Sequence, residues 1–386
     1  MIARQRRKLA LRILKPRIPQ QRSIAKYPHT HSSGFYAKTC CKHCRNLGEE
    51  RCFVKRLLLV ILVAALGWSG FWFIGAQSLR NNISLWFENR QDTGWIAVYR
   101  AVSVRGFPNR FDTNFTNLEL ADPSTGWAWS VDFFQLFSLS YKPTHLIAVW
   151  PPQQKLSTPN SKLAISSADM RASLVVDDPK SLALDRSSFI AKDLTVTNAD
   201  QTGVRASLIS LALQRRDLAT HSYQIALSAE GLGPLEETRK KIDPSTMLPS
   251  YLQLLKADMT IAFDRPWDRS ALEALRPQPT AIDLHLAQAT WGVLDLKIAG
   301  KLAVDAAGWP SGDVTVKASQ WREILELTRS AGQLPDHVID LTEKALAFLA
   351  RLKGQDSSLD LTLTLKGQQI FFGPIAIAPA PRLHLR

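Results

Sequence analysis

The most constraining feature of this sequence is an uncharged apolar run of twenty residues, from Leu57 to Ala76 (LLLVILVAALGWSGFWFIGA). At about 1.5 Å per residue, a helix of this length is about 30 Å long, the thickness of the hydrocarbon core of a bilayer. The second half of the run carries Trp68, Phe71, Trp72 and Phe73, residue types that favour a membrane interface. The run therefore predicts a transmembrane helix.

Two other interpretations of the run are weaker. A cleaved signal peptide has an apolar region of about 7 to 15 residues and an A-x-A-like cleavage site. This run is longer, and Ile74-Gly75-Ala76 is a poor version of that site. A buried core helix is disfavoured because the run has no polar face and is preceded by Lys55-Arg56. We therefore expect an uncleaved signal anchor over 54–76.

The positive charge of the chain is concentrated before this anchor. The net charge is +14, and residues 1–53 hold 13 Lys or Arg but only two acidic residues. From Leu57 onward there are 33 basic and 32 acidic residues, so the rest of the chain is electrically balanced. A balanced body lacks the field that attracts polyanions, and no nucleic-acid partner is predicted. The positive-inside rule places the N-terminus in the cytoplasm and residues after 77 across the membrane.

The leader, residues 1–53, also contains every cysteine of the chain: Cys40, Cys41, Cys44 and Cys52. No disulfide can therefore link parts of the body. The C-x-x-C pair and the nearby His29, His31 and His43 are zinc-ligand types, but a second ligand pair at finger-like spacing is missing. No metal site is predicted.

We expect this leader to be disordered or not translated. Val54-Lys55-Arg56-Leu57 is typical of the start of a bacterial export signal, and a GUG codon can encode either an internal valine or the initiator. Translation would then begin at Val54. The alternative is an Arg-rich organellar transit peptide.

Beyond residue 77, apolar and polar residues alternate with a period of two, which is typical of strands with one buried face. The pattern recurs in roughly a dozen segments, among them 99–104, 127–133, 168–176, 204–213, 223–229, 259–263, 282–286 and 294–304. Between Phe115 and Leu118 the alternation shifts by one residue, which predicts a β-bulge. Because βαβ units would need a helix between successive strands, the pattern predicts an antiparallel sheet.

Helices are expected to be few and late. The clearest are 319–331, with Ser319 as N-cap, and 335–353, while shorter ones are predicted at 235–241, 248–256 and 270–275. The predicted fold class is α+β, mainly β. An N-terminal transmembrane helix is followed by an extended, curved antiparallel β-sheet over 77–386, with a few helices packed late in the chain.

Catalytic signatures are missing from the sequence. It has no G-x-S-x-G, G-x-G-x-x-G, Walker or H-E-x-x-H motif. The histidines of the body are single: His145, His221, His285, His337 and His384. Nine tryptophans lie outside the apolar run, and we expect them to fill the core of the sheet rather than to stack on ligands. No catalytic, cofactor-binding or metal-binding residue is predicted, and the protein is not expected to be an enzyme.

Several motifs of the body occur together in a known family. They are Lys55-Arg56-Leu57, Val104-Arg105-Gly106-Phe107-Pro108-Asn109-Arg110-Phe111, Leu118-Glu119-Leu120-Ala121-Asp122-Pro123, Trp127-x-Trp129, the 139–148 stretch LSYKPTHLIA and the closing 373–381 stretch GPIAIAPAP. Over Val54–Arg386 the chain resembles the alphaproteobacterial proteins catalogued as domain of unknown function 2125. That family carries no established activity or catalytic residues.

A second resemblance has mechanistic content. Over Trp95–Pro123, an anchor followed by a valine-rich strand, a Gly-Phe-Pro corner and a Leu-x-Leu-x-Asp-Pro strand is similar to the opening of AsmA-like envelope proteins. Their long curled sheets form apolar grooves associated with lipid traffic. The resemblance implies a single-pass protein of the bacterial inner membrane whose periplasmic body binds or shields lipid or another apolar envelope component. The alternative is a structural or interaction module of the cell envelope, with protein partners that the sequence does not identify.

Overall fold

The computed structural model describes residues 43–385 apart from 220, 245, 247, 274–275, 331–338, 341–342, 345 and 348–357. Its helices are α1 (His43–Asp92), α2 (Glu236–Ile242), α3 (Arg269–Glu273) and α4 (Trp321–Ser330). Its strands are β1 (Ile96–Arg105), β2 (Arg110–Asp122), β3 (Trp127–Leu139), β4 (Lys142–Val149), β5 (Gln153–Ser157), β6 (Lys162–Ser166), β7 (Asp169–Val176), β8 (Leu184–Asn198), β9 (Gly203–Asp217), β10 (Ser222–Glu230), β11 (Gly233–Pro234), β12 (Leu254–Phe263), β13 (Pro279–Trp291), β14 (Leu294–Val304), β15 (Pro310–Ser319), β16 (Ser358–Lys366), β17 (Gln369–Phe372) and β18 (Ile375–Pro379). The fold is mainly β, as predicted.

The apolar run lies within α1, one continuous helix that extends past the run to Asp92. Among the described helices, α1 is long and apolar enough to cross a membrane. Leu58, Val60 and Leu66 are 59, 64 and 64% exposed, so this stretch is not the buried core helix of a soluble domain. By compactness the chain divides inside α1, between Val63 and Ala64, so the rest of α1 belongs to the same unit as the sheet.

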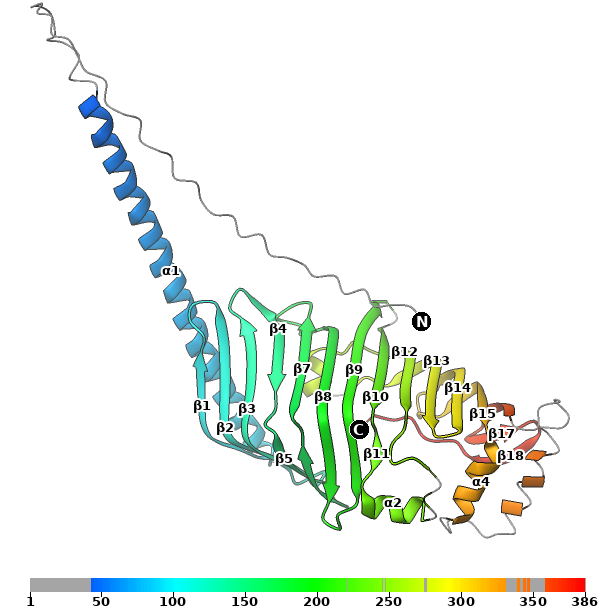
Figure 1. Cartoon of the computed structure of the whole chain (residues 1–386). Coiled ribbons are helices and arrows are strands. Elements are labelled where there is room, and N and C mark those ends of the chain that lie inside the picture. The colour runs from blue at the N-terminus through cyan, green and yellow to red at the C-terminus, as the bar shows by residue number, and fades with distance from the viewer. Residues whose placement is uncertain are drawn as a thin grey trace, which may run out of the picture. The chain divides into compact units, whose positions relative to one another are not determined.

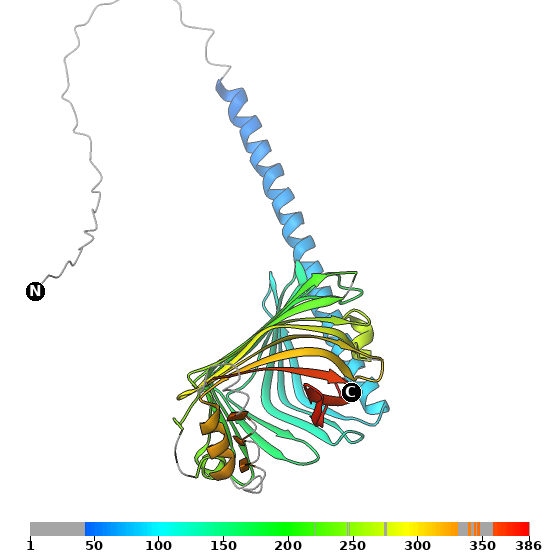
Figure 2. The ribbon, with the colours of Figure 1, turned by 90° about the vertical axis from the view of Figure 1, so that its right-hand side faces the viewer.

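The strands form a single antiparallel sheet that follows the order of the chain (Figure 1). From β1 to β3 and from β12 to β18, each strand pairs with the next along the chain. In between, β3 pairs with both β4 and β5, and β8 pairs with both β6 and β7. From there β9 leads to β10, and β10 pairs with β12. Figure 2 shows that this sheet is strongly curved.

The shift in alternation predicted within β2 is present, but its cause is different. The buried side chains of β2 change phase from Phe115 to Leu118. No bulge is involved, because β2 keeps one register with both β1 and β3. Instead, Asn117 has φ 47°, in the left-handed region, and this single residue reverses which side of the strand is buried. The prediction of a bulge was therefore wrong.

The short helices were predicted with mixed success. Helices α2, α3 and α4 lie where 235–241, 270–275 and 319–331 were predicted, although Ser319 is the last residue of β15 rather than an N-cap. The helix expected over 248–256 is wrong. There the backbone N–H of Leu252 donates to the Leu232 carbonyl, and from Leu254 onward the chain is β12. Of the helix expected over 335–353, only 339–340, 343–344 and 346–347 are described.

Clusters of buried side chains lie near both ends of the sheet, and single buried residues such as Ala191 and Tyr223 lie on its central strands. At the β1 end, Phe87 of α1 packs with Ala97, Phe115 and Leu118, and Trp72 and Ala76 pack with strand residues nearby. At the other end, Trp321 of α4 packs with Ala318 and Leu359. The core of this fold is therefore built by helices that lie on one face of the sheet, not by a second sheet in the described part of the chain.

Candidate functional site

The pairing register divides the sheet into an apolar and a polar face. Residues directly paired in neighbouring strands point to the same face, and adjacent residues within a strand point to opposite faces. One row of paired residues crosses the sheet as Val104, Thr113, Leu136, Ala148, Ala172, Phe189, Leu211, Leu227, Ala257, Ala287, Ile298, Val316 and Leu361. We call the side to which this row points the apolar face. Apart from Thr113, every member of the row is hydrophobic.

The row one residue away lies on the opposite side, the polar face. It consists of Ser103, Asn114, Gln135, Val149, Arg171, Ile190, Ser210, Ser228, Lys256, Gln288, Lys297, Lys317 and Asp360. The contrast between the two rows holds in ten of the thirteen strands. The exceptions are β2, with Thr113 in the apolar row, and β4 and β8, with Val149 and Ile190 in the polar row. The apolar row itself runs from one end of the sheet to the other.

Helices α1 and α4 cover the apolar face near its ends, and α3 lies beside the segment before β8, where the backbone N–H of Arg269 donates to the Ser181 carbonyl. Helix α1 packs on β1 to β3, and α4 packs near β14 to β16. Helix α2 packs against β9 and β11 and buries none of its own side chains. On the central strands, Leu211 of the apolar row remains 38% exposed. A large apolar surface without a covering element is rare on a soluble monomer and marks a binding surface.

An aromatic row connects the α1-covered end of this face with its open centre. The rings of Phe115 and Phe134 have centroids 6.3 Å apart, those of Phe134 and Trp150 are 5.4 Å apart, and those of Trp150 and Phe189 are 6.1 Å apart. Phe189 is paired with Leu211. These rings supply flat, rigid apolar area along the face. Most tryptophans are at least half-buried as predicted, but Trp127 is 52% exposed at a turn.

Helix α1 is attached to the sheet by side chains that the apolar run supplies. The indole N–H of Trp68 donates to the Pro108 carbonyl at 3.0 Å, and that of Trp72 donates to the Arg110 carbonyl at 2.8 Å. Gly75 allows this close approach, because a Cβ there would lie 2.9 Å from the ring of Phe111. Sequence reasoning assigned these residues to the membrane alone, since a hydropathy pattern carries no information about contacts over some 40 residues.

The histidines of the body do not form a sheltered catalytic site in the described residues. His145 contacts the Ser173 hydroxyl at 2.9 Å. His285 lies 3.5 Å from the Thr260 hydroxyl and 3.4 Å from the Asp258 carboxylate. The three side chains thus follow one another as the hydroxyl, imidazole and carboxylate of a catalytic triad do. These contacts are long, and the side chains of His285 and Asp258 are 42% and 47% exposed, so nothing excludes water from them.

Metal ligands are also not gathered in the described part of the chain. No group of three or more His, Cys, Asp or Glu side chains there could hold a metal ion. Cys40, Cys41, His29 and His31 lie outside the described residues, and the side chains of Cys44 and Cys52 are not described either. The described residues therefore do not test the zinc-ligand pattern of the leader.

Residues 72–381 match the family described as uncharacterized protein conserved in bacteria (DUF2125), and the chain belongs to this family. The match begins at Trp72, within the segment of α1 that packs on the sheet. Comparison with curated proteins and with solved structures gave no match. The description of this family gives no activity.

Proposed function

We propose that this protein is a single-pass membrane protein whose sheet holds the acyl chains of lipids on its apolar face, without covalent catalysis. The continuous apolar row, left open between β7 and β13 by the described helices, is the observation that carries the proposal. The likeness of Trp95–Pro123 to AsmA-like proteins adds support. Acyl chains are long and apolar, so they match a continuous apolar surface better than a compact polar ligand does.

The proposed location follows from the charges that flank the anchor. Lys55 and Arg56 precede the apolar run directly, and the residues after α1 are electrically balanced. The positive-inside rule then places the sheet in the periplasm and the N-terminus in the cytoplasm of a bacterial cell. Cleavage after Ala76 is disfavoured because Ala76 is 2% exposed and packs with Val104 and Phe111.

Two neighbouring residues on β9 test this proposal. Leu211 belongs to the apolar row, whereas Ala212 points to the polar face and is paired with Ser188 and Ala226. Both are exposed. We expect Leu211→Glu to abolish binding of a fluorescent fatty acid by the purified full chain, because a carboxylate among acyl chains is unfavourable. Ala212→Glu should bind as the unaltered protein does.

Lipid carried through purification, identified by mass spectrometry, gives a second readout for the same pair. Equal lipid content and equal fatty-acid binding in Leu211→Glu and Ala212→Glu would show that the apolar face is not the binding surface. An unaltered protein that carries no lipid and takes up no fatty acid would refute the proposal outright.

A protein-docking module is the second candidate, and strand β18 favours it. Among the described strands β18 pairs only with β17, and Ile375 and Ile377 are 63% and 55% exposed. An open apolar edge strand is a template for pairing with another chain. Crosslinking from Ile377 that captured a stoichiometric protein partner, in a chain that carried no lipid, would support this function over the first.

A further inference from the structure

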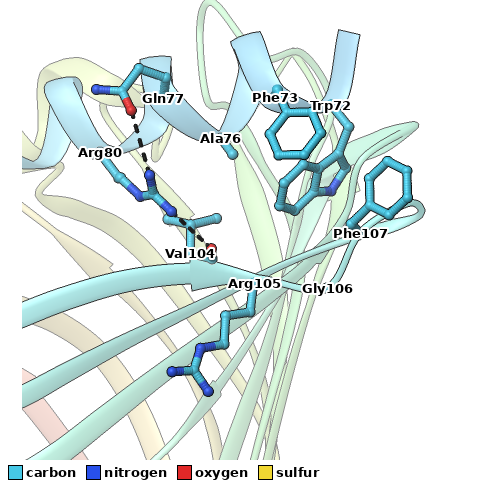
Figure 3. Close-up of a pocket in the computed structure, with 9 residues that line it drawn as sticks. All are labelled: Trp72, Phe73, Ala76, Gln77, Arg80, Val104, Arg105, Gly106 and Phe107. Atoms are coloured by element: carbon cyan, nitrogen blue, oxygen red, sulfur yellow. Dashed lines mark hydrogen bonds between the residues drawn. The ribbon is translucent and has the colours of Figure 1, made fainter. Parts of the chain in front are cut away.

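A pocket lies between α1 and β1, at the place where the apolar run meets the sheet. It has a volume of about 560 Å³, within the range of about 300–1,000 Å³ common for small-molecule sites. Its walls are apolar at one end, with Trp72, Phe73 and Phe107, and polar at the other, with Gln77 and Arg80 (Figure 3). The pocket therefore has the two-part character of a lipid, with an apolar and a polar section.

Two cations, Arg80 and Arg105, line this pocket, and Arg80 is the one on α1. Its guanidinium donates to the Val104 carbonyl at 3.1 Å and to the side-chain oxygen of Gln77 at 3.5 Å. None of the ion pairs found among the described residues includes it. A guanidinium has five N–H donors, so several remain for a ligand, and its planar fork matches the oxygens of a phosphate. Arg105 points away from α1 on the other side of β1 (Figure 3).

The position of the pocket relative to the bilayer follows from residues that have two roles. Trp68 and Trp72 lie in the apolar run and also donate hydrogen bonds to the β1–β2 turn. If the membrane-spanning part of α1 ends near Trp68, this turn lies at the membrane surface. The turn presents Phe107, which is 50% exposed, and the adjoining β3–β4 turn presents Tyr141, which is 63% exposed. Exposed aromatic residues of this kind favour the headgroup region.

The pocket also adjoins the apolar face. Val104, one of its lining residues, begins the apolar row that continues through Thr113 and Leu136. A lipid whose phosphate lay on Arg80 would thus have its chains next to the first strands of that face. The charge of Arg80 favours a ligand with a phosphate over a neutral diacylglycerol, which has similar chains but no anionic group.

We propose that the α1–β1 pocket binds the phosphate of a membrane phospholipid through Arg80, at the point where the lipid passes from the bilayer onto the apolar face. This inference rests on the proposed function and assigns it a ligand class and an entry site. Phe73 and Phe107 line the side of the pocket that takes the chains. Gln77 orients the guanidinium through its side-chain oxygen.

Photocrosslinking in the full-length protein tests the site. A photoreactive benzoylphenylalanine replaces Phe107, and the protein is reconstituted in phosphatidylcholine vesicles with a trace of radiolabelled phosphatidylglycerol or of radiolabelled diacylglycerol. We expect Arg80→Gln to lower phosphatidylglycerol capture roughly tenfold, the loss expected for one hydrogen bond to a charged group, and to leave diacylglycerol capture unchanged. Arg100→Gln, at an arginine of the same strand that does not line the pocket, is the matched control and should change neither.

Further variants separate binding from folding. Arg80→Lys keeps the charge and should retain part of the phosphatidylglycerol capture, whereas a merely structural role in tying α1 to β1 would lower capture of both lipids equally. The same probe in place of Trp127, which is 52% exposed, measures the background. Equal phosphatidylglycerol capture by Arg80→Gln and the unaltered protein would overturn the proposal.

The probe in place of Leu211 distinguishes this inference from the function on which it rests. Capture at Leu211 that does not depend on Arg80 would overturn the headgroup site and leave the apolar face as a lipid-binding surface. No capture at Leu211 in any protein would overturn the proposed function itself, even if Arg80 retained its effect at Phe107.

Discussion

Asn117 determines, at the scale of one residue, which side chains of β2 are buried. Its φ of 47° is costly for a residue with a Cβ, but asparagine tolerates this region better than most others. We expect Asn117→Val to lower the free energy of unfolding by about 1–2 kcal/mol, because a β-branched residue is strained there. Asn117→Gly, which relieves the strain, should leave stability nearly unchanged. Urea unfolding followed by tryptophan fluorescence measures both, and an equal loss in the two variants would contradict this explanation.

Asp258 on the polar face gives a pH-dependent contribution to stability. Its pKa is lowered first by the hydrogen bond from the Gln224 side chain, 3.0 Å long, and then by the contact with His285. A carboxyl whose folded pKa lies below its unfolded value of about 3.9 stabilises the fold above that pH. The contribution disappears as the pH falls through the folded pKa.

We therefore expect Gln224→Ala to move the acid unfolding midpoint to higher pH. At a pH well below the folded and unfolded pKa values of Asp258, its carboxyl is protonated in the variant and in the unaltered protein. The part of the stability difference that comes from this carboxyl should then vanish. Gln214 is paired with Gln224 on the neighbouring strand and no hydrogen bond to Asp258 involves it, so Gln214→Ala is the control. The test is to measure unfolding of both variants between about pH 2 and 6, a range that includes the usual carboxyl pKa. Identical acid unfolding midpoints for Gln224→Ala and Gln214→Ala would refute the prediction.

Helix α1 shows at the scale of an element how one segment can serve the membrane and the sheet. Gly75 faces the ring of Phe111, whereas Gly70 has no atom within 4 Å of a Cβ built on it. We expect Gly75→Leu to push α1 away from the β1–β2 turn and to cost about 1–3 kcal/mol, as overpacking does. Gly70→Leu on the same helix should cost little. Thermal unfolding measures the difference, and a larger effect at Gly70 would contradict this packing.

At the scale of the whole molecule, the stability of a fragment depends on where the folded unit begins. Trp72 and Ala76 are 5% and 2% exposed and pack with Val104 and Phe111, although both precede residue 77. A fragment over 77–386 therefore lacks part of its own core. We expect it to be less stable than a fragment over 64–386 by at least about 3 kcal/mol, the usual cost of removing one buried tryptophan. Equal melting temperatures for the two fragments would show that α1 contributes nothing to the fold.

Much of the fold follows from local patterns in the sequence. Alternation with a period of two predicted the strands, and the uncharged run predicted the membrane helix, because both depend on neighbouring residues. The helix expected over 248–256 failed because long-range bonds act there: the Trp291 indole N–H donates to the Pro249 carbonyl at 2.7 Å, and β12 pairs with β10. Propensity over a few residues cannot anticipate such partners.

The candidate site was less accessible to sequence reasoning. Arg80 is one arginine among many in the sequence, and only its contact with Val104, 24 residues away, places it beside an apolar pocket. Phe107 was recognised as part of a Gly-Phe-Pro corner, but its proximity to Trp72, with ring centroids 5.5 Å apart, was not. The sequence signal for this site is the pair of tryptophans in the apolar run, because the indole N–H of Trp68 donates to the Pro108 carbonyl in the β1–β2 turn.

The sequence by itself determined that this protein has an uncharged helix able to span a membrane, a charge-balanced body and strands with one apolar side each. These properties depend on composition and on the period of the chain. Only the tertiary structure decided that the apolar sides of thirteen strands join into one face, that the described helices leave its centre open, and that the end of the membrane run packs on the sheet. Each of these depends on register and on contacts between distant residues, where one residue such as Asn117 can reverse the side that is buried.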